Sequence, residues 1–460
     1  MTNGVSNQDI RQRFPDLHPA FSRQEATVEA NRCLYCADAP CAAACPTHID
    51  VPKFIKKISS DNLRGSALTI LEANILGASC ARVCPVDVLC EGACVMHRFN
   101  REPIEIGRLQ RYAMDHFTWG QGFGPAAGLP PGASPMKVAC IGSGPASLSC
   151  AAEVTRRGHH AVVFEGKRYP GGLNTYGVAE YKLHAEESIQ EVAFIQSLGV
   201  EIRTGEQIDN ARLKRIANEY DAVFLGIGNG RMEPLGIPGE GLSGVVDALR
   251  FIADYKTAQT IPVRGRVAIV GAGNTAIDAA IAALRLGAER SVIIYRRTQR
   301  EMPAFGFEYE HAKQEGVDFC WSSKPMRIVG QNGRVAGIEC LRVKPNLEAI
   351  AGSEFTIGCD MVIPAIGQSK SSTLLSGIPG IDTRKGLIEV DRETGRTGNP
   401  KFYAGGDIVN GGREVVDAVA DGKRAAQAIV AQAVSPVRSS LSDPVGQAVP
   451  PVISDRSTHA

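Results

Sequence analysis

Apolar and polar residues follow two different patterns along the chain, and the pattern changes after residue 118. Residues 1–118 show the spacing of short amphipathic helices, for example over Val51–Ile58. Residues 119–136 contain five Gly and four Pro, which is typical of a linker. From Lys137 onward, short apolar strands alternate with Gly-rich turns and helices. The sequence therefore predicts a helical N-terminal domain, a linker and then α/β domains.

The first α/β repeat has the order strand, Gly-rich turn, helix, strand and acid. Lys137–Ile141 is a predicted strand, the helix that follows stops before Gly158, and the second strand ends in Glu165. The turn of such a unit lies at a helix N-terminus, which favours a pyrophosphate, and the acid can accept from a ribose hydroxyl. The residues expected to hold the pyrophosphate are Gly142, Ser143, Gly144, Pro145 and Ala146.

The same order occurs a second time, from Arg266 to Tyr295. The predicted turn residues that contact a second dinucleotide are Ala272, Gly273, Asn274 and Thr275. The closing strand ends in Arg296 and Arg297 instead of an acid. Arginine can pair with a 2′-phosphate, which favours NADPH over NADH. The alternative is that both arginines are simply solvated, so the coenzyme stays open at this point.

Later motifs indicate that the two units bind two different dinucleotides. Small residues after an apolar run allow a flat ring to approach the backbone closely. An acid after a strand can hold a polyol hydroxyl. A helix N-terminus can face a ring carbonyl or a phosphate. The residues in such positions are Gly171, Gly172, Leu173, Ala365, Ile366, Gly367, Gly406, Asp407, Val415 and Val416. The sequence therefore predicts one discontinuous domain of residues 137–261 and 360–436, into which a second domain of residues 262–359 is inserted. Residues 437–460, rich in Ser and Pro, are predicted to be a disordered tail.

Composition and charge exclude several classes of protein. The chain has 460 residues, 44% of them hydrophobic and 22% charged, which is ordinary for a globular protein. Its formal net charge of +1 argues against a nucleic-acid partner or a basic membrane-binding patch. No stretch approaches the roughly 20 apolar residues of a membrane span, and the N-terminus has no apolar signal segment. A cytoplasmic location is expected.

Eight of the thirteen cysteines lie between residues 33 and 94. The first four read C-x2-C-x4-C-x3-C-P, and the second four read C-x3-C-P-x4-C-x3-C. In a chain without an export signal such groups indicate metal binding. The spacing resembles bacterial ferredoxin runs, so two 4Fe–4S clusters fit better than structural zinc, which remains the alternative.

In combination, these motifs resemble the flavin and iron–sulfur reductase module shared by the glutamate synthase small subunit and the N-terminal part of dihydropyrimidine dehydrogenase. The motifs are the cysteine set, GSGPAS, E-x6-GGL, GAGNTA, YRR-x5-MPA and AGGD-x9-DAV-x2-GK. The segment Pro103–Ala113 is similar to the dehydrogenase branch, in which a Gln is an unusual cluster ligand; in this chain that residue is Gln110. The resemblance implies a helical iron–sulfur domain followed by two Rossmann-like domains, with the NAD(P) domain inserted in the FAD domain.

The resemblance also implies how the clusters are held. The first cluster would be bound by Cys33, Cys36, Cys41 and Cys94. The second would be bound by Cys45, Cys84, Cys90 and Gln110, which leaves Cys80 without a ligand role. Spacing alone does not decide between Cys80 and Gln110, because thiolate is the commoner ligand.

Roles at the flavin and at the nicotinamide follow by the same resemblance. Residues Gly142–Ala146 would hold the FAD pyrophosphate and Glu165 its ribose, while Gly172, Leu173 and Lys182 would lie along the flavin. Gly406 and Asp407 would hold the ribityl chain, and Val416 would face the ring. Residues Ala272–Thr275 would bind NAD(P)H, with Arg296 and Arg297 at its adenosine end and Glu414 near the carboxamide. No side-chain acid or base is needed for hydride transfer, so no conventional catalytic residue is predicted.

The family further implies a partner. In bacterial two-subunit dihydropyrimidine dehydrogenases a PreT-type chain takes in electrons, generally from NADH, whereas the Arg296 and Arg297 pair favours NADPH. A PreA-type chain with FMN reduces uracil or thymine, and the two form a heterotetramer. The rival interpretations are a glutamate synthase small subunit, a stand-alone NAD(P)H:acceptor reductase, and a zinc-bearing nucleotide-binding scaffold.

Overall fold

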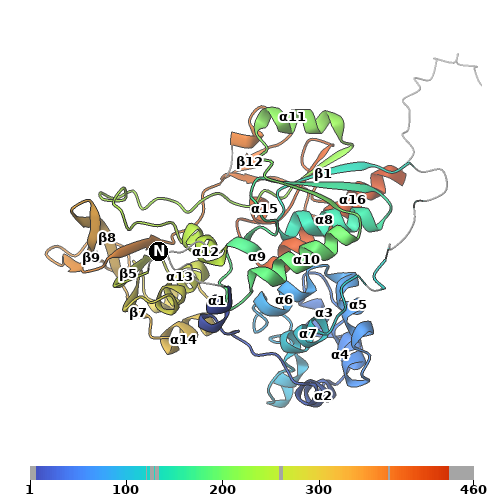
Figure 1. The fold of residues 1–460 in the computed structure, drawn as a ribbon, viewed down its shortest axis with the longest axis horizontal. Helices are drawn as coiled ribbons and strands as arrows, with labels where there is room; N and C mark the ends of the chain where they lie inside the picture. The colour runs from blue at the N-terminus through green and yellow to red at the C-terminus, as the bar shows by residue number, and fades with distance from the viewer. Residues whose placement is uncertain are drawn as a thin grey trace, which may run out of the picture.

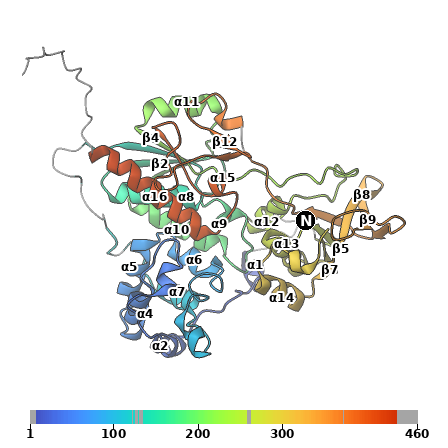
Figure 2. The ribbon, with the colours of Figure 1, turned by 180° about the vertical axis from the view of Figure 1, so that it is seen from behind.

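The computed structural model describes residues 7–120, 122–124, 129, 134–257, 263–370 and 373–434. Most of the predicted linker, residues 119–136, and all of the predicted tail, residues 437–460, lie outside the described residues. The described chain forms a helical unit and two α/β units, which lie side by side (Figure 1; Figure 2 shows the reverse side). The α/β class with a helical N-terminal domain, expected from the sequence, is confirmed.

The N-terminal domain is built from short helices joined by the cysteine-bearing loops. Its elements are α2 (Arg23–Asn31), α3 (Pro40–Ala43), α4 (Val51–Ser59), α5 (Leu63–Ala73), α6 (Gly77–Val83), the 3-10 helix η1 (Val95–Phe99) and α7 (Ile106–Asp115). The helix α1 (Asn7–Arg13) precedes them in the chain and packs elsewhere. Side chains of Asp50 and Asn62 cap α4 and α5 by accepting from Lys53 N and Gly65 N. Phe54 and Leu109 are fully buried where α4 and α7 meet.

The first α/β unit contains a five-stranded parallel sheet in the order β14-β4-β1-β2-β3. Its strands are β1 (Lys137–Ile141), β2 (His160–Glu165), β3 (Glu201–Thr204), β4 (Ala222–Leu225) and β14 (Phe402–Ala404). The helices are α8 (Pro145–Arg156), α9 (Leu173–Tyr176), α10 (Ala185–Ser197), α11 (Asn210–Glu219), α15 (Asp407–Asn410) and α16 (Val415–Val434). A 3-10 helix η3 (Thr373–Leu375) and a ribbon of β12 (Thr383–Arg384) and β13 (Leu387–Ile388) complete the unit. Because β14 pairs with β4, this unit is discontinuous in sequence.

The second α/β unit contains a four-stranded parallel sheet in the order β11-β5-β6-β7. These strands are β5 (Arg266–Val270), β6 (Arg290–Ile294), β7 (Asp318–Cys320) and β11 (Met361–Pro364). The helices are α12 (Ala248–Lys256), α13 (Asn274–Arg285), η2 (Gln299–Glu301) and α14 (Gly306–Gln314). Three antiparallel strands form a separate sheet: β8 (Ser323–Gln331), β9 (Arg334–Arg342) and β10 (Phe355–Ile357).

The boundaries of the inserted unit differ from those expected. The run Met361–Ile366 was assigned to the first unit, but β11 pairs with β5 of the second, Val362 opposite Ala268. The chain crosses between the units as two antiparallel stretches, in which Gly230 N donates to Ser369 O at 2.8 Å and Ser369 N to Arg231 O at 2.8 Å. The inserted unit therefore lies between these crossing stretches, and not between residues 262 and 359.

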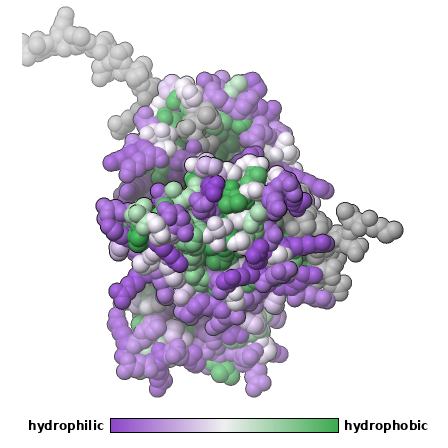
Figure 3. Space-filling model, turned by 90° about the vertical axis from the view of Figure 1, so that its left-hand side faces the viewer, coloured by the Kyte–Doolittle hydropathy of each residue, from purple (hydrophilic) through white to green (hydrophobic). Residues whose placement is uncertain are grey.

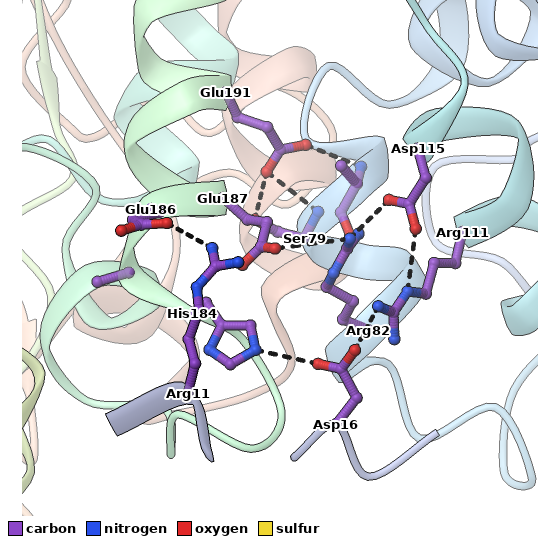
Figure 4. A network of polar contacts seen from close by, with 12 residues as sticks. Arg11, Asp16, Ser79, Arg82, Arg111, Asp115, His184, Glu186, Glu187 and Glu191 are labelled. Carbon is purple, nitrogen blue, oxygen red and sulfur yellow. Dashed lines mark hydrogen bonds and ion pairs between the residues drawn. The ribbon is translucent and has the colours of Figure 1, made fainter. Parts of the chain in front are cut away.

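An N-terminal strap, residues 10–19, contacts all three units. Ile10 and Phe14 are buried against α12 and α13, and the Phe14 ring stacks on Tyr255 at 5.1 Å between centroids. Asp16 then binds Arg111 of α7 at 2.5 Å and His184, next to α10, at 3.1 Å (Figure 4). The strap thus ties the helical domain to both α/β units.

We predict that this junction weakens above neutral pH. Burial alone would lower the pKa of His184, but hydrogen bonds with Asp16 and Glu180 raise it to about 9. A histidine whose folded pKa is raised stabilises the fold fully below its unfolded pKa, and this contribution disappears as the pH rises through about 9. Allowing for solvent screening, about 1–2 kcal/mol of unfolding free energy should be lost. Urea unfolding at a series of pH values should show this loss in the parent and not in His184→Gln; identical profiles for the two would contradict it.

Candidate cofactor and electron-transfer sites

The first Gly-rich turn joins β1 to α8 and requires glycine where it turns. Gly142 has φ +86°, and a Cβ there would stand 2.6 Å from the carbonyl oxygen of Gly226. Gly144 is the N-cap of α8, and Pro145 occupies its first turn. The free N–H groups of this turn favour an anion such as a pyrophosphate.

The acid at the end of β2 faces this turn. Glu165 is buried, and one of its carboxylate oxygens accepts from the backbone N of Ser143 at 3.0 Å and from the Ser143 hydroxyl at 2.5 Å. The other oxygen accepts from Lys167 N at 2.7 Å. The carboxylate is thus held beside the pyrophosphate turn, the position that the sequence predicts for a ribose ligand.

Two further glycine loops meet the N-terminus of α8. A Cβ on Gly172 would stand 2.7 Å from Gly144 Cα, and a Cβ on Gly406 would stand 3.2 Å from Ala146 Cβ. Asp407 begins α15 directly after Gly406, and burial raises the pKa of its carboxyl. Leu173 begins α9, and Val415 and Val416 begin α16, which packs along α8. The loops at Gly172 and Gly406, far apart in the sequence, therefore form with the N-terminus of α8 a cradle that has no side-chain bulk at these two positions, which fits a dinucleotide such as FAD.

A cavity of about 550 Å³ lies at the carboxyl ends of β5, β6 and β11. Gly271 lines it with φ +126°, and a Cβ there would stand 2.2 Å from Ala365 O. Of the predicted coenzyme residues, those that line the cavity are Ala272, Gly273, Thr275, Arg296, Ala365, Ile366 and Gly367. The last three follow β11, so they belong to this second cavity and not to the FAD unit in which they were expected.

Two predicted coenzyme residues have other partners. The Asn274 side chain accepts from Phe305 N at 3.2 Å, which holds the loop before α14 against the start of α13. Arg297 forms an ion pair with Glu301 at 2.9 Å. Neither is among the residues that line the cavity.

Lys182 and Glu414 lie where the two α/β units meet. The ammonium group of Lys182 is buried and binds Asp278 of α13 at 2.6 Å and Glu308 of α14. Asp278 also accepts from the Tyr181 hydroxyl at 2.8 Å. Burial, with the neighbouring acids Asp417 and Glu308, raises the pKa of Glu414 to about 7. The structure thus gives Lys182 a role in joining the units; its placement along a flavin stays a prediction.

The four cysteines assigned to the first cluster line one apolar cavity. Its thiols are Cys33, Cys36, Cys41 and Cys94, among side chains such as Val51, Ile55 and Met96. Burial, with the neighbouring Cys33 and Cys94 thiols, raises the pKa of Cys41 to about 11. These are the four cysteines that the resemblance assigns to one cluster.

The second set of cysteines consists of Cys45, Cys80, Cys90 and Cys84, and the first three lie near the Cys84 thiol. A hydrogen bond with Cys80, burial and the nearby Cys90 and Cys45 thiols raise the pKa of Cys84 well above its usual value. Cys80 lies on α6, which ends just before Cys84. Gln110 is buried on the facing helix α7, where its amide nitrogen donates to Gly77 O at 2.7 Å. Cys80 is thus in contact with Cys84, whereas Gln110 packs on the opposite end of the same helix α6, at Gly77.

A single metal ion fits these groups poorly. Four ligand atoms of a zinc site must lie about 2.3 Å from one ion. Among the residues that the structure describes, no three His, Cys, Asp or Glu side chains converge in this way. The thiolates of an iron–sulfur cluster bind several metal ions and need not converge on a single point.

A buried carboxylate holds the helical N-terminal domain, which carries the cysteines, against the FAD unit. Glu191 of α10 is fully buried and accepts from Ala78 N at 2.8 Å and Ser79 N at 3.0 Å, at the start of α6 (Figure 4). Burial raises the pKa of this carboxyl to about 7. Beside this contact, a cavity of about 110 Å³ is lined by Cys84 and by Tyr181 and Lys182. The second cysteine set therefore faces the junction of the two α/β units.

Several residues of these sites are not found by sequence reasoning. Asp278 and Glu308 bind Lys182, Asn229 and Gln368 line the larger cavity from the crossing stretches, and Lys324 lines it from β8. The position of Asp278 could have been inferred from the sequence, because it lies four residues after Asn274 on a predicted helix, and residues at i and i+4 share a helix face. The others depend on tertiary contacts.

Comparison with known proteins agrees with this architecture. Residues 10–121 match the family model described as dihydropyrimidine dehydrogenase domain II, 4Fe-4S cluster, and residues 136–422 match that of the pyridine nucleotide-disulphide oxidoreductases. Among solved structures, Mycobacterium tuberculosis FprA in complex with NADPH (19% identity, TM-score 0.53) covers 65% of this chain and 84% of its own. Lactococcus lactis thioredoxin reductase (23%, TM-score 0.53) covers 65% and 99%. These two show the fold alone.

Curated relatives extend over most of the chain. The glutamate synthase (NADPH) small chains of Halomonas elongata and Escherichia coli are each 33% identical over 91% of this chain and 93% of their own length. The NADP(+)-dependent formate dehydrogenase subunit beta of Moorella thermoacetica is 35% identical over 85% of this chain and 59% of its length.

The fold and the sites define an NAD(P)-dependent flavin and iron–sulfur oxidoreductase. The chain belongs to the pyridine nucleotide-disulphide oxidoreductase family and carries an N-terminal iron–sulfur domain. Within the described part of the chain, no helix has the length and apolarity needed to cross a membrane.

Proposed function

We propose that this chain is the electron-input subunit of a two-component reductase. It would oxidise NAD(P)H at the junction of its α/β units and pass electrons through two 4Fe–4S clusters to a separate protein. The observation that carries this proposal is the cavity shared by Cys84, Tyr181 and Lys182, which places the second cysteine set against that junction. Bound FAD would supply the conversion of an electron pair into single electrons.

The chain's own residues account for binding and orientation in this scheme. The turn at Gly142–Ala146 with Glu165 would hold the FAD, and Asp407 its ribityl chain. The Lys182 ion pairs fix the inserted unit against the FAD unit, so that a nicotinamide in the larger cavity would meet the flavin in one orientation. Glu191 fixes the cluster domain on the same unit.

For the partner we propose an FMN-containing, PreA-type subunit that reduces the 5,6 bond of uracil or thymine reversibly, in a heterotetramer. The segment around Gln110, and the burial of this residue where α7 packs on α6, support it. A second candidate is a glutamine-using glutamate synthase large subunit, which the near full-length similarity to glutamate synthase small chains favours equally.

Co-expression with each partner under exclusion of oxygen tests this proposal. Oxidation of NADH and NADPH is followed with uracil, and separately with 2-oxoglutarate plus glutamine. Uracil-dependent oxidation with the FMN subunit supports the first partner, and dependence on 2-oxoglutarate plus glutamine supports the second. Oxidation that occurs only with artificial acceptors, with neither partner stimulating it, would contradict both.

A further inference from the structure

The larger cavity is cationic at one end. Of the described residues that line it, only Arg296 and Lys324 carry a charge at neutral pH, and no carboxylate lines it. Asn229 and Gly411 of the FAD unit line it beside the crossing stretches that follow β11, whereas Arg296 follows β6, on the other side of β5. A nicotinamide that reacts with the flavin must lie at the FAD end, so the adenosine end of the coenzyme lies between the two cations.

The backbone brings Lys324 to this position. Tyr295 N donates to Cys320 O at 3.0 Å, which extends the pairing of β6 with β7 by one residue. The chain then turns at Ser322, which has φ +51°, and Ser322 N donates to Arg297 O at 3.0 Å. Ser323 N donates to Tyr295 O at 3.0 Å. Two hydrogen bonds thus bracket Arg296 and place Lys324 on the stretch beside it.

The left-handed conformation of Ser322 supports a role for this turn. Such a conformation is uncommon in a residue other than glycine and persists where the surroundings impose it. Here it directs the first residues of β8 along the end of β6, and Lys324 reaches the cavity as a result. Figure 3 shows this side of the molecule, where hydrophilic side chains surround smaller apolar areas.

The second arginine of the predicted pair is engaged elsewhere. Arg297 binds Glu301, which also accepts from Thr298 N at 3.2 Å in a capped turn. Its charge is neutralised outside the cavity, so the cation that stands with Arg296 comes from β8 and not from the adjacent sequence position.

We propose that Lys324, together with Arg296, binds the 2′-phosphate of NADPH and makes this chain prefer NADPH to NADH. A phosphate dianion between two cations forms charge-assisted hydrogen bonds, and an unphosphorylated ribose would leave both cations without a partner. This inference deepens the proposed function, because it names the coenzyme that the same site accepts.

The test measures binding of 2′,5′-ADP and 5′-AMP to the full chain by calorimetry, without any partner or electron acceptor. The parent should bind 2′,5′-ADP at least tenfold more tightly than 5′-AMP. Lys324→Met should weaken 2′,5′-ADP about tenfold, as expected for one charged hydrogen bond, and leave 5′-AMP unchanged. Lys324→Arg should retain the preference. With an artificial acceptor, the ratio of kcat/KM for NADPH to that for NADH should fall by the same factor in Lys324→Met.

Arg297→Met is the matched control, because it removes the same charge from a neighbouring position outside the cavity. It should change 2′,5′-ADP binding by less than about threefold. Equal binding of the two probes by the parent would overturn the proposal. So would parental 2′,5′-ADP binding by Lys324→Met, or an equal loss in Arg297→Met. Failure of every partner in the oxidation assay would contradict the proposed function alone, since probe binding requires no partner.

Discussion

Gly172→Val should abolish retention of FAD. Gly172 has φ +59° and ψ −134°, a conformation that a β-branched residue adopts only at high cost, about 1–3 kcal/mol or more. A Cβ there would also stand 2.7 Å from Gly144 Cα, at the start of α8. The two atoms nearest to this Cβ, Gly144 Cα and Gly144 N, both belong to the backbone, so the loop must move away from the pyrophosphate turn. The flavin content of the purified protein and its NADPH oxidation with an artificial acceptor should both fall at least tenfold.

Gly241→Val is the matched control for this substitution. Gly241 is exposed, and nothing lies within 4 Å of the position of its Cβ. This variant should keep parental flavin content and thermal stability. Stoichiometric FAD in Gly172→Val, with parental activity, would contradict the assignment of the cradle at the N-terminus of α8.

Gln110→Ala should disrupt the second cluster, and Cys80→Ala should leave it intact. If the amide of Gln110 is a ligand, Gln110→Ala removes one of four attachments and Cys80→Ala removes none. We expect Gln110→Ala to lose most of one cluster, with FAD retained, and Cys80→Ala to keep both. Iron content and the EPR signals after reduction with dithionite report on the two clusters.

Cys84→Ala provides the positive control, since Cys84 is a ligand in either scheme. Gln110→Glu tests whether an oxygen ligand suffices at this position, because it keeps the size and an oxygen atom. Cluster loss in Cys80→Ala with parental signals in Gln110→Ala would reverse the ligand assignment. It would also remove the residue that favours the pyrimidine-reducing partner.

Much of the nucleotide-binding geometry could be predicted from local sequence patterns. The turn after β1 and the acid after β2 are 22 residues apart, yet Ser143 and Glu165 are hydrogen-bonded, as a strand–turn–helix–strand unit requires. The amphipathic helix expected over Val51–Ile58 is confirmed as α4, because its apolar spacing is unambiguous. The helix start expected at Val415 is that of α16.

The sheet to which a strand belongs was harder to predict. Met361–Pro364 is buried throughout, and an apolar run of this kind does not encode its neighbour. Its pairing with β5 is decided by the crossing stretches, whose hydrogen bonds join residues more than a hundred positions apart. The same holds for Lys324, which reaches the cavity only through a turn at Ser322 that has no sequence signal.

The identity of the fourth ligand of the second cluster also lies beyond local patterns. Cys80 and Gln110 come from the helices α6 and α7, which pack together; Cys80 contacts Cys84, and Gln110 contacts Gly77 at the start of α6. Both residues are buried, so burial does not decide between them, and the choice depends on the chemistry of the loaded cluster.

The most direct test of electron flow through the clusters compares the parent with Cys84→Ala under exclusion of oxygen. NADPH oxidation is measured with a small diffusible acceptor and then with the cognate partner subunit and its substrate. If electrons leave through the clusters, Cys84→Ala keeps parental rates with the diffusible acceptor and loses at least nine-tenths of the partner-dependent rate. Parental rates of Cys84→Ala with the partner would contradict the account, because electrons would then reach the partner without the second cluster.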